Sequence, residues 1–149
     1  EDITRELGVS KGSFYTYFET KDELLYEILG KIKKKIVEAL ETINTNQKPE
    51  KILEDYVKIK MNSAVEILNN MRLDSLQKNI CNPKLICFFE EIREKSIDFI
   101  KINIVEKFNE KNGNKYEAKI ISEFILISIE EFLYDEFVLK SFRNMKEDE

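Results

Sequence analysis

The sequence predicts an all-α protein with a helix-turn-helix head and a helical-bundle body. The 149 residues include only four glycines and two prolines, and 42% of them are hydrophobic and 36% charged, a composition that suits a helical globular protein. Apolar residues recur at steps of three and four along most of the chain, which places them on one face of a helix. We expect the head and its connecting helix to span residues 1–43, and the body to span residues 44–149.

The head is organised around the segment from Leu7 to Phe18, LGVSKGSFYTYF. Gly8 can adopt the positive φ that ends a helix, and Ser10 can cap the next helix with its hydroxyl. Two short helices joined by a glycine-containing turn form a helix-turn-helix, whose second helix usually enters the major groove of DNA. The segment therefore predicts a DNA-binding motif.

The second helix of this motif has two distinct faces. The apolar side chains that can pack together beneath the turn are Ile3, Leu7, Val9, Phe14 and Phe18. The residues left on the outward face are Lys11, Gly12, Ser13, Tyr15, Thr16 and Tyr17. Phosphate oxygens accept hydrogen bonds from Lys, Ser, Thr and Tyr, and a glycine lets the backbone approach closely, so these six residues are the predicted DNA-contacting set. The alternative is that the two tyrosines are partly buried core aromatics.

The motif resembles the DNA-binding signature of TetR-type transcriptional regulators. The resemblance rests on Asp2-Ile3, on the run from Gly8 to Phe18, and on Lys21-Asp22-Glu23-Leu24-Leu25. It implies that the positions of Lys11, Gly12, Tyr15, Thr16 and Tyr17 touch bases or phosphates, and that Lys21 holds a phosphate. Because the family has another helix before this motif, we expect that the chain begins inside the second helix and that the first helix is missing from it.

A long helix is expected to connect the head to the body. Thr20 and Glu23 form a capping box, in which the Thr hydroxyl accepts from the third helical amide and the Glu side chain reaches back. The apolar stripe that follows is Leu25, Ile28, Leu29, Ile32, Ile36, Leu40 and Ile43. Four lysines between residues 31 and 35 are interpreted as a solvated face, with a contact to phosphates or to a membrane surface as the alternative.

Polar breaks divide the rest of the chain into further helices. Residues 44–48 form the first break, and Pro49 suits the first turn of the next helix. A shorter helix is expected around residues 73–80. Asn82-Pro83 supplies a cap and a first helical residue for another long helix, which is expected to stop around residues 112–114.

The last helix differs from the others, because residues 120–129 are apolar almost all round. A helix without a polar face must be covered on both sides. In a small body the second cover is most simply a second copy of the same surface, as in a two-fold dimer, and the TetR resemblance implies such a homodimer. The predicted interface residues are Ile121, Phe124, Ile125, Ser128 and Phe132. The alternative is a helix buried entirely within its own subunit.

The sequence offers no arrangement that indicates catalysis, a cofactor or a metal site. Without histidine there is no Ser–His or Cys–His pair, and no glycine-rich phosphate loop occurs. Cys81 and Cys87 are too few for a zinc site and are interpreted as a reduced pair, with a redox switch as the alternative. No segment approaches the roughly twenty apolar residues that span a membrane. We expect a cytoplasmic protein that is not an enzyme and does not act at a membrane.

Charge is unevenly distributed along the chain. Residues 1–35 carry seven basic and seven acidic side chains, whereas residues 36–149 carry 17 basic and 22 acidic ones. An acidic body with a neutral head fits a protein that touches DNA at one end only.

The TetR resemblance implies that the body encloses a small-molecule effector. The candidate pocket residues are Tyr56, Met61, Phe88, Phe89, Tyr116 and Phe124. Because this lining is mostly apolar, it favours a hydrophobic or amphipathic effector.

These observations together predict a homodimeric repressor. Its two recognition helices would enter successive major grooves about 34–36 Å apart on a palindromic operator, and the effector would release it by tilting the long helix. The alternative is a helical interaction or scaffold module that binds a partner protein and no DNA. Salt distinguishes the two, because phosphate contacts make the logarithm of the affinity for DNA fall linearly with the logarithm of the salt concentration.

Overall fold

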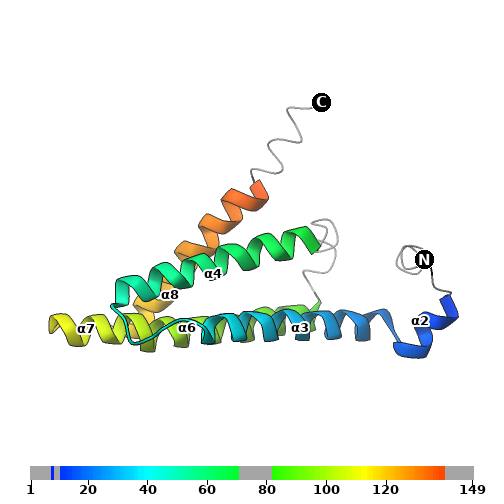
Figure 1. The fold of residues 1–149 in the computed structure, drawn as a ribbon, viewed down its shortest axis with the longest axis horizontal. Coiled ribbons are helices and arrows are strands. Elements are labelled where there is room, and N and C mark those ends of the chain that lie inside the picture. Colours follow the sequence, from blue (N-terminus) through cyan, green and yellow to red (C-terminus); the bar gives the residue numbers. More distant parts are fainter. Residues whose placement is uncertain (1–7, 9–10, 71–81, 140–149) are drawn as a thin grey trace, which may run out of the picture. The chain divides into compact units, whose positions relative to one another are not determined.

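The computed structural model of the protein describes residues 8, 11–70 and 82–139, which form an all-α fold (Figure 1). No strand occurs among these residues, so the predicted fold class is confirmed. The contacts divide the chain into two compact units, residues 1–37 and residues 38–149. The functional boundary expected after residue 43 stays a prediction, because compactness alone does not report which part binds DNA.

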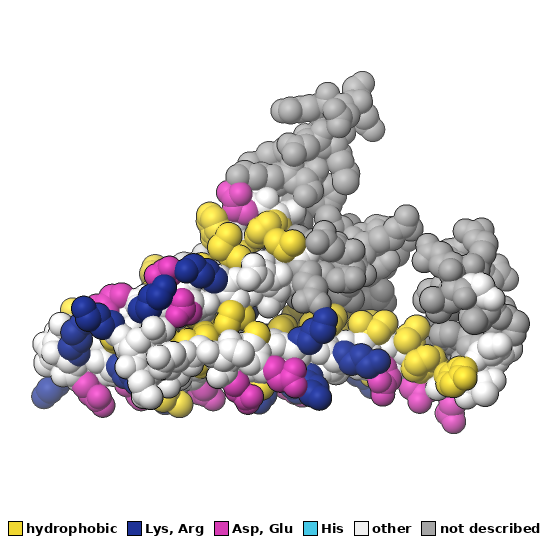
Figure 2. Space-filling view, viewed as in Figure 1, with side chains coloured by type: hydrophobic (Ala, Val, Ile, Leu, Met, Phe, Trp, Pro, Cys, Tyr) yellow, Lys and Arg dark blue, Asp and Glu magenta, His cyan; other side chains and the backbone are white. Residues whose placement is uncertain are grey.

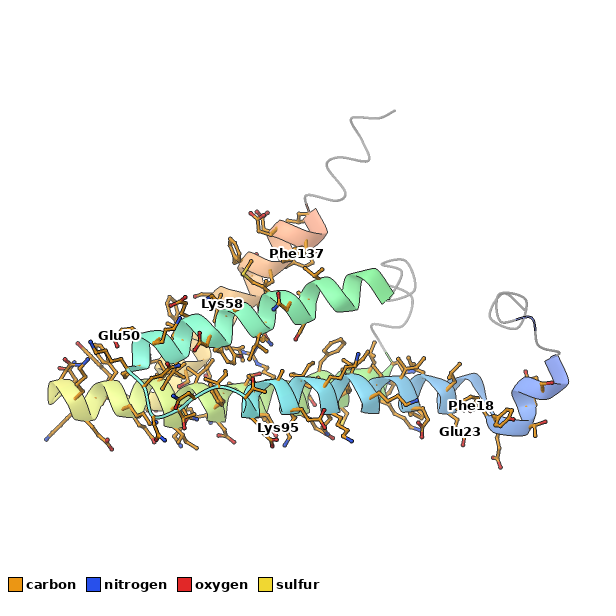
Figure 3. The ribbon with its side chains drawn as sticks, viewed as in Figure 1. Phe18, Glu23, Glu50, Lys58, Lys95 and Phe137 are labelled. Atoms are coloured by element: carbon orange, nitrogen blue, oxygen red, sulfur yellow. The ribbon has the colours of Figure 1, made fainter. Side chains whose placement is uncertain are left out.

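The first unit contains the short helix α2 (Lys11–Tyr17) and most of the long helix α3 (Lys21–Glu41). The Glu23 N–H donates to Thr20 Oγ1 at 3.1 Å, and the Glu19 N–H donates to the Glu23 carboxylate at 2.6 Å. This is the predicted capping box, with Glu19 supplying the second amide. Phe18 lies in the turn between the two helices, and Glu23 lies in the first turn of α3 (Figure 3).

The apolar stripe of α3 is enclosed along most of its length. Its buried members are Leu29, Ile36 and Leu40, and Ile43 is buried just after the helix ends. Ile28 is instead 41% exposed, so the expectation of one continuous buried face is wrong at this position. At about 100° per residue, Ile28 lies at the margin of the stripe, where a neighbouring element covers less of the side chain.

The second unit is built from long helical segments that contain π-helical turns. Their bounds are α4 (Pro49–Asn70), α6 (Pro83–Ile100), η1 (Lys101–Val105), α7 (Glu106–Asn112), α8 (Ala118–Leu133) and η2 (Tyr134–Leu139). The π-helical η1 joins α6 to α7 without a break, and the π-helical η2 continues α8. The sequence predicts these helices but not their π-helical turns.

The ends of the helix that begins at α6 are set by the residues that the sequence predicts. Asn82 Oδ1 accepts a hydrogen bond from the Lys84 N–H at 3.0 Å, and Pro83 occupies the first helical position. At the far end α7 stops at Asn112, where Gly113 adopts a φ of +66°. Glycine favours this left-handed conformation because it lacks a Cβ atom.

The core of the second unit lies where η1 packs against α4 and α8. Ile104 and Val105 of η1 are buried, and Leu126 of α8 is fully buried. The Tyr56 ring on α4 stacks on Phe99 of α6 with 5.7 Å between the ring centroids. These contacts hold α4, α6 and α8 around one centre.

Polar bonds fasten α7 to the segment where α4 begins. Lys107 Nζ donates to the Thr45 carbonyl, and Lys111 Nζ pairs with Glu50 Oε1 at 3.6 Å. From this end, α4 and α6 diverge toward the end of the unit where α6 begins (Figure 1).

Two further expectations concern a short helix and membrane-spanning segments. The short helix expected around residues 73–80 lies outside the described residues. None of the helices that the structure describes combines the length and the apolar content that crossing a membrane requires.

Candidate functional site

The outward face of α2 presents aromatic and small side chains to solvent. Tyr15 is 49% exposed and Tyr17 is 79% exposed, and Gly12 and Thr16 are exposed beside them. Tyr17 is therefore largely open to solvent, and Tyr15 is about half covered. The helix KGSFYTY contains no acidic residue, so no carboxylate within it would repel a phosphate.

The other predicted members of this face are less accessible or not described. Ser13 is half-buried. The side chains of Lys11 and Lys21 are not among those that the structure describes, and Ile3, Leu7 and Val9 of the expected inner face lie outside the described residues.

Local backbone features position α2. Gly8 has a φ of +63°, which is the left-handed conformation that the sequence predicts for it. Thr16 Oγ1 donates to the Gly12 carbonyl at 3.1 Å, so a phosphate that accepts from Thr16 would have to displace this bond. Phe18 is half-buried at the turn into α3.

A second surface of interest is the outward side of α8. Leu126 and Leu133 are buried on one side of the helix, together with Ser122. At about 100° per residue, the opposite side carries a set of large apolar residues. Their exposed fractions are 57% for Ile120, 36% for Ile121, 68% for Phe124, 51% for Ile127 and 52% for Phe132.

We call this side, with Ser128 included, the α8 outer face. Hydrophobic side chains gather where α8 continues into η2 (Figure 2). Of the predicted interface residues, Ile121, Phe124, Ser128 and Phe132 are exposed on the outer face, and Ile125 is half-buried at its edge. The described residues of a single chain thus leave one apolar face of α8 uncovered.

The six residues predicted to line an effector pocket lie in different environments. Tyr56 is fully buried and Met61 is half-buried on α4. Phe88 and Phe89 pack edge to face with 5.4 Å between their ring centroids. The remaining two, Tyr116 and Phe124, are 57% and 68% exposed. Phe124 belongs to the α8 outer face, on the side of the helix away from the core.

Polar groups that the sequence analysis did not single out meet inside the body. Tyr56 and Ser96 are fully buried, and neither hydroxyl has a hydrogen-bond partner. Arg93 Nη1 of α6 pairs with Glu130 Oε2 of α8 at 2.7 Å. Lys60, half-buried, lies one turn beyond Tyr56 on α4. We call these five residues the inner polar cluster.

The ionisable groups of the inner polar cluster influence one another. Burial raises the pKa of Tyr56 to about 12, the adjacent Ser96 hydroxyl opposes the rise, and the charge of Glu130 adds to it. Burial lowers the pKa of Lys60, while Glu130 raises it and Arg93 lowers it further. Ser96 lies beside Tyr56 but in a geometry that pairs neither hydroxyl. Ser96 thus lies beside the Tyr56 hydroxyl, and the Arg93–Glu130 pair lies within electrostatic reach of Lys60.

A sequence signal for this cluster does exist. Ile52, Tyr56 and Lys60 follow one another at steps of four, which places a lysine on the core-facing stripe of α4. In the same way Ser96 lies between Ile92 and Ile100, both buried. A charged or hydroxyl residue at a position where the periodicity predicts an apolar core residue indicates such a buried polar cluster.

Comparison with known proteins identifies the N-terminal segment. Residues 1–28 match the family model described as "Bacterial regulatory proteins, tetR family". No curated protein and no solved structure matches the chain significantly. The matched segment contains Gly8 and α2, which are the turn and the second helix of the predicted helix-turn-helix, and the beginning of the connecting helix α3. The N-terminal segment therefore matches the DNA-binding head of tetR-family proteins, which supports a DNA-binding transcriptional regulator.

Proposed function

We propose that the protein is a repressor that binds a palindromic operator as a homodimer and leaves the operator when a small-molecule effector binds in the body. The observation that carries this proposal is the α8 outer face. A palindromic operator has two-fold symmetry, and a two-fold dimer matches it with one recognition helix for each half-site.

The exposed apolar side chains of the α8 outer face support an isologous interface there. Removing apolar surface from water stabilises by about 25 cal/mol per Å², and a contiguous exposed apolar patch on a globular protein usually marks an interaction site. Phe124, at 68% exposed, lies between Ile121 and Ile127. Two copies of this face would cover each other, with the same residues contributed by each subunit.

Each subunit would contact DNA through α2 and the start of α3. Tyr15, Thr16 and Tyr17 are exposed on α2, and hydroxyls donate readily to phosphate oxygens. Lys21, the first residue of α3, would add a positive charge against a neighbouring phosphate. Lys11, Gly12 and Ser13 complete the proposed surface at the start of α2.

The link between effector and operator would be α3. This helix runs unbroken from Lys21 to Glu41 and crosses the division between the two compact units after residue 37. A change in the body that tilts α3 would therefore move α2, and with it the spacing of the two recognition helices. The affinity for the operator would fall because both half-sites can no longer be engaged together.

Selection of binding sites from random duplex DNA tests the proposal. We expect a palindrome whose half-sites lie about 10 base pairs apart, one helical turn. Tyr15→Ala and Lys21→Ala should each weaken binding to that palindrome several-fold, whereas the controls Tyr116→Ala and Lys115→Ala, at exposed positions of the second unit, should not. A folded dimer that enriches no palindrome would overturn the proposal and leave the protein-interaction module as the better function.

A further inference from the structure

We propose that the effector is an amphipathic molecule with one anionic head group, and that the inner polar cluster holds this head group. The inference rests on the proposed function in one respect: it takes the body to be the part of the regulator that binds an effector. It then names the chemical class of that effector and the residues that recognise it.

The most deeply buried part of the inner polar cluster, which we call its floor, consists of two hydroxyls without hydrogen-bond partners. Tyr56 and Ser96 are 0% exposed, and neither Tyr56 Oη nor Ser96 Oγ forms a hydrogen bond. A buried polar group left unpaired costs about 1–3 kcal/mol, and native cores usually avoid it. Two such hydroxyls, one from α4 and one from α6, offer adjacent donors to an oxygen anion.

The cluster holds one more positive charge than negative charge. Glu130 already accepts a hydrogen bond from Arg93 at 2.7 Å. In the part of the chain that the structure describes, Lys60 forms no ion pair, and Glu130 acts on it only through its field. Lys60 therefore has a positive charge that is only partly hydrated and has no ion-pair partner among the described residues. One anionic group would neutralise it and satisfy the hydroxyls beside it.

Apolar side chains continue from the cluster along α6. Phe89 and Ile86 lie one and two turns before Arg93 on the same side of the helix, and they are 48% and 45% exposed. Phe88 packs edge to face against Phe89. These residues belong to the first two turns of α6, and α4 and α6 diverge toward the end where α6 begins (Figure 1). They could cover the apolar part of a ligand whose head group lies deeper.

The rim of the cluster is open to solvent. The side chains of Arg93 and Glu130 are 37% and 40% exposed, and we infer that a ligand enters the cluster beside them. The site would thus combine the two buried hydroxyls, the Lys60 cation and the exposed apolar side chains of α6. This combination fits an aliphatic or aromatic monocarboxylate better than a neutral or cationic molecule.

The test is calorimetric titration of the full chain with monocarboxylates from hexanoate to dodecanoate, each below its micelle concentration. The matched neutral and cationic probes are the alcohol and the primary amine of the same chain length. We expect at least one acid to bind at least about tenfold more tightly than its alcohol, and the amine not to bind. If every alcohol binds as tightly as its acid, recognition is by the apolar part alone and the proposal is wrong.

Two substitutions on the same helix locate the binding. Lys60→Met should weaken binding of the best acid at least about tenfold, since a hydrogen-bonded charge pair would be lost. Lys58→Met is the matched control, because Lys58 lies on the same helix and its side chain is 59% exposed (Figure 3). Equal affinities in the Lys60→Met variant and the parent protein would place the acid elsewhere, on the α8 outer face for example, and overturn the proposal.

A subtler variant guards against loss of folding. Tyr56→Phe removes one donor from the floor but keeps the stack on Phe99, so we expect unchanged helical content and a several-fold weaker affinity for the acid. An unchanged affinity would overturn the role of the floor.

The experiments can contradict acid binding in the body and effector-driven release from DNA independently of each other. Acid binding that depends on Lys60 but leaves operator affinity unchanged would support the inner polar cluster as a ligand site and contradict the proposed effector release. Operator release by a ligand whose affinity is insensitive to Lys60→Met would support the proposed function and overturn this inference.

Discussion

Tyr56 combines two opposing features in one side chain. Its ring stacks on Phe99 and is fully buried, which stabilises the core, while its hydroxyl has no hydrogen-bond partner. A phenylalanine would keep the ring packing without the unpaired oxygen. The tyrosine therefore makes physical sense if its hydroxyl has a use other than packing the core.

The first prediction concerns stability without ligand. Tyr56→Phe should raise the free energy of unfolding by about 1 kcal/mol, because it removes a buried polar group that lacks a partner. Urea denaturation of the two proteins measures the change, with Tyr134→Phe as a control at a tyrosine that is 50% exposed. A loss of stability in the Tyr56→Phe variant would mean that the hydroxyl is already satisfied in the folded protein.

The second prediction concerns pH. Because burial lowers the pKa of Lys60 below its ordinary value of 10.5, the unfolded chain holds more protons than the folded chain between the lowered pKa and 10.5. The contribution of Lys60 to stability therefore rises with pH in that window. Lys60→Met should be more stable than the parent protein at pH 7, and this advantage should shrink as the pH approaches 10.

Denaturation at a series of pH values checks this second prediction. Tyr56 opposes the trend only above its ordinary pKa of 10.0, because burial raises its pKa to about 12, so the measurements should stop at pH 10. Lys95→Met, at an exposed position of α6 (Figure 3), is the control for replacing a lysine by a methionine. An advantage of Lys60→Met that stays constant from pH 7 to pH 10 would contradict the prediction.

At the scale of the element, α8 has two apolar sides with different environments. Leu126 is fully buried on the inner side, and Phe124, two residues earlier, is 68% exposed on the outer side. One helix would thus serve the fold on one side and assembly on the other.

The third prediction separates these two roles. Phe124→Lys should weaken self-association by tenfold or more while leaving thermal unfolding of the dilute protein nearly unchanged, because it places a charge in the proposed interface. Leu126→Ala should lower the free energy of unfolding by about 2–5 kcal/mol. Analytical ultracentrifugation over a range of concentrations measures the first effect, and an unaltered dimer in the Phe124→Lys variant would exclude the α8 outer face as the interface.

At the scale of the whole molecule, the charge of the chain opposes binding to DNA outside the head. Residues 36–149 carry 22 acidic and 17 basic side chains, so the body is repelled by phosphates. Binding must then come from a few contacts at α2 and the start of α3.

The fourth prediction follows from that small number of contacts. The logarithm of the operator affinity should fall linearly with the logarithm of the salt concentration, and Lys21→Ala should reduce the slope by about 1 if Lys21 contacts one phosphate. Fluorescence anisotropy with labelled operator between about 50 and 200 mM salt measures both slopes. Identical slopes for the two proteins would remove Lys21 from the interface.

The sequence predicts those features that depend on neighbouring residues. Thr20 with Glu23, Asn82 with Pro83, and Gly113 set helix ends through bonds and backbone angles within a few residues, so each could be predicted without knowledge of the fold. The family match at residues 1–28 confirms the predicted helix-turn-helix in the same local way.

Features that depend on how helices pack could not be predicted so directly. Lys60, Arg93, Ser96 and Glu130 come together only because α4, α6 and α8 surround one centre, and no single helix records that arrangement. The exposure of Ile28 has a similar origin, since the periodicity places it in a stripe but does not say how wide the covering element is.

The continuity of α3 across the two compact units has a consequence for insertions. A helix advances about 100° and 1.5 Å per residue, so one residue inserted after Val37 would turn the entire helix-turn-helix by more than a quarter of a revolution. Seven inserted residues, close to two full turns, would nearly restore its angular phase and displace it by only about 10 Å. An insertion in α3 should therefore be tolerated when it restores the angular orientation of the helix-turn-helix, even if it is longer than one that does not. A flexible loop at the same place would tolerate insertions of any of these lengths.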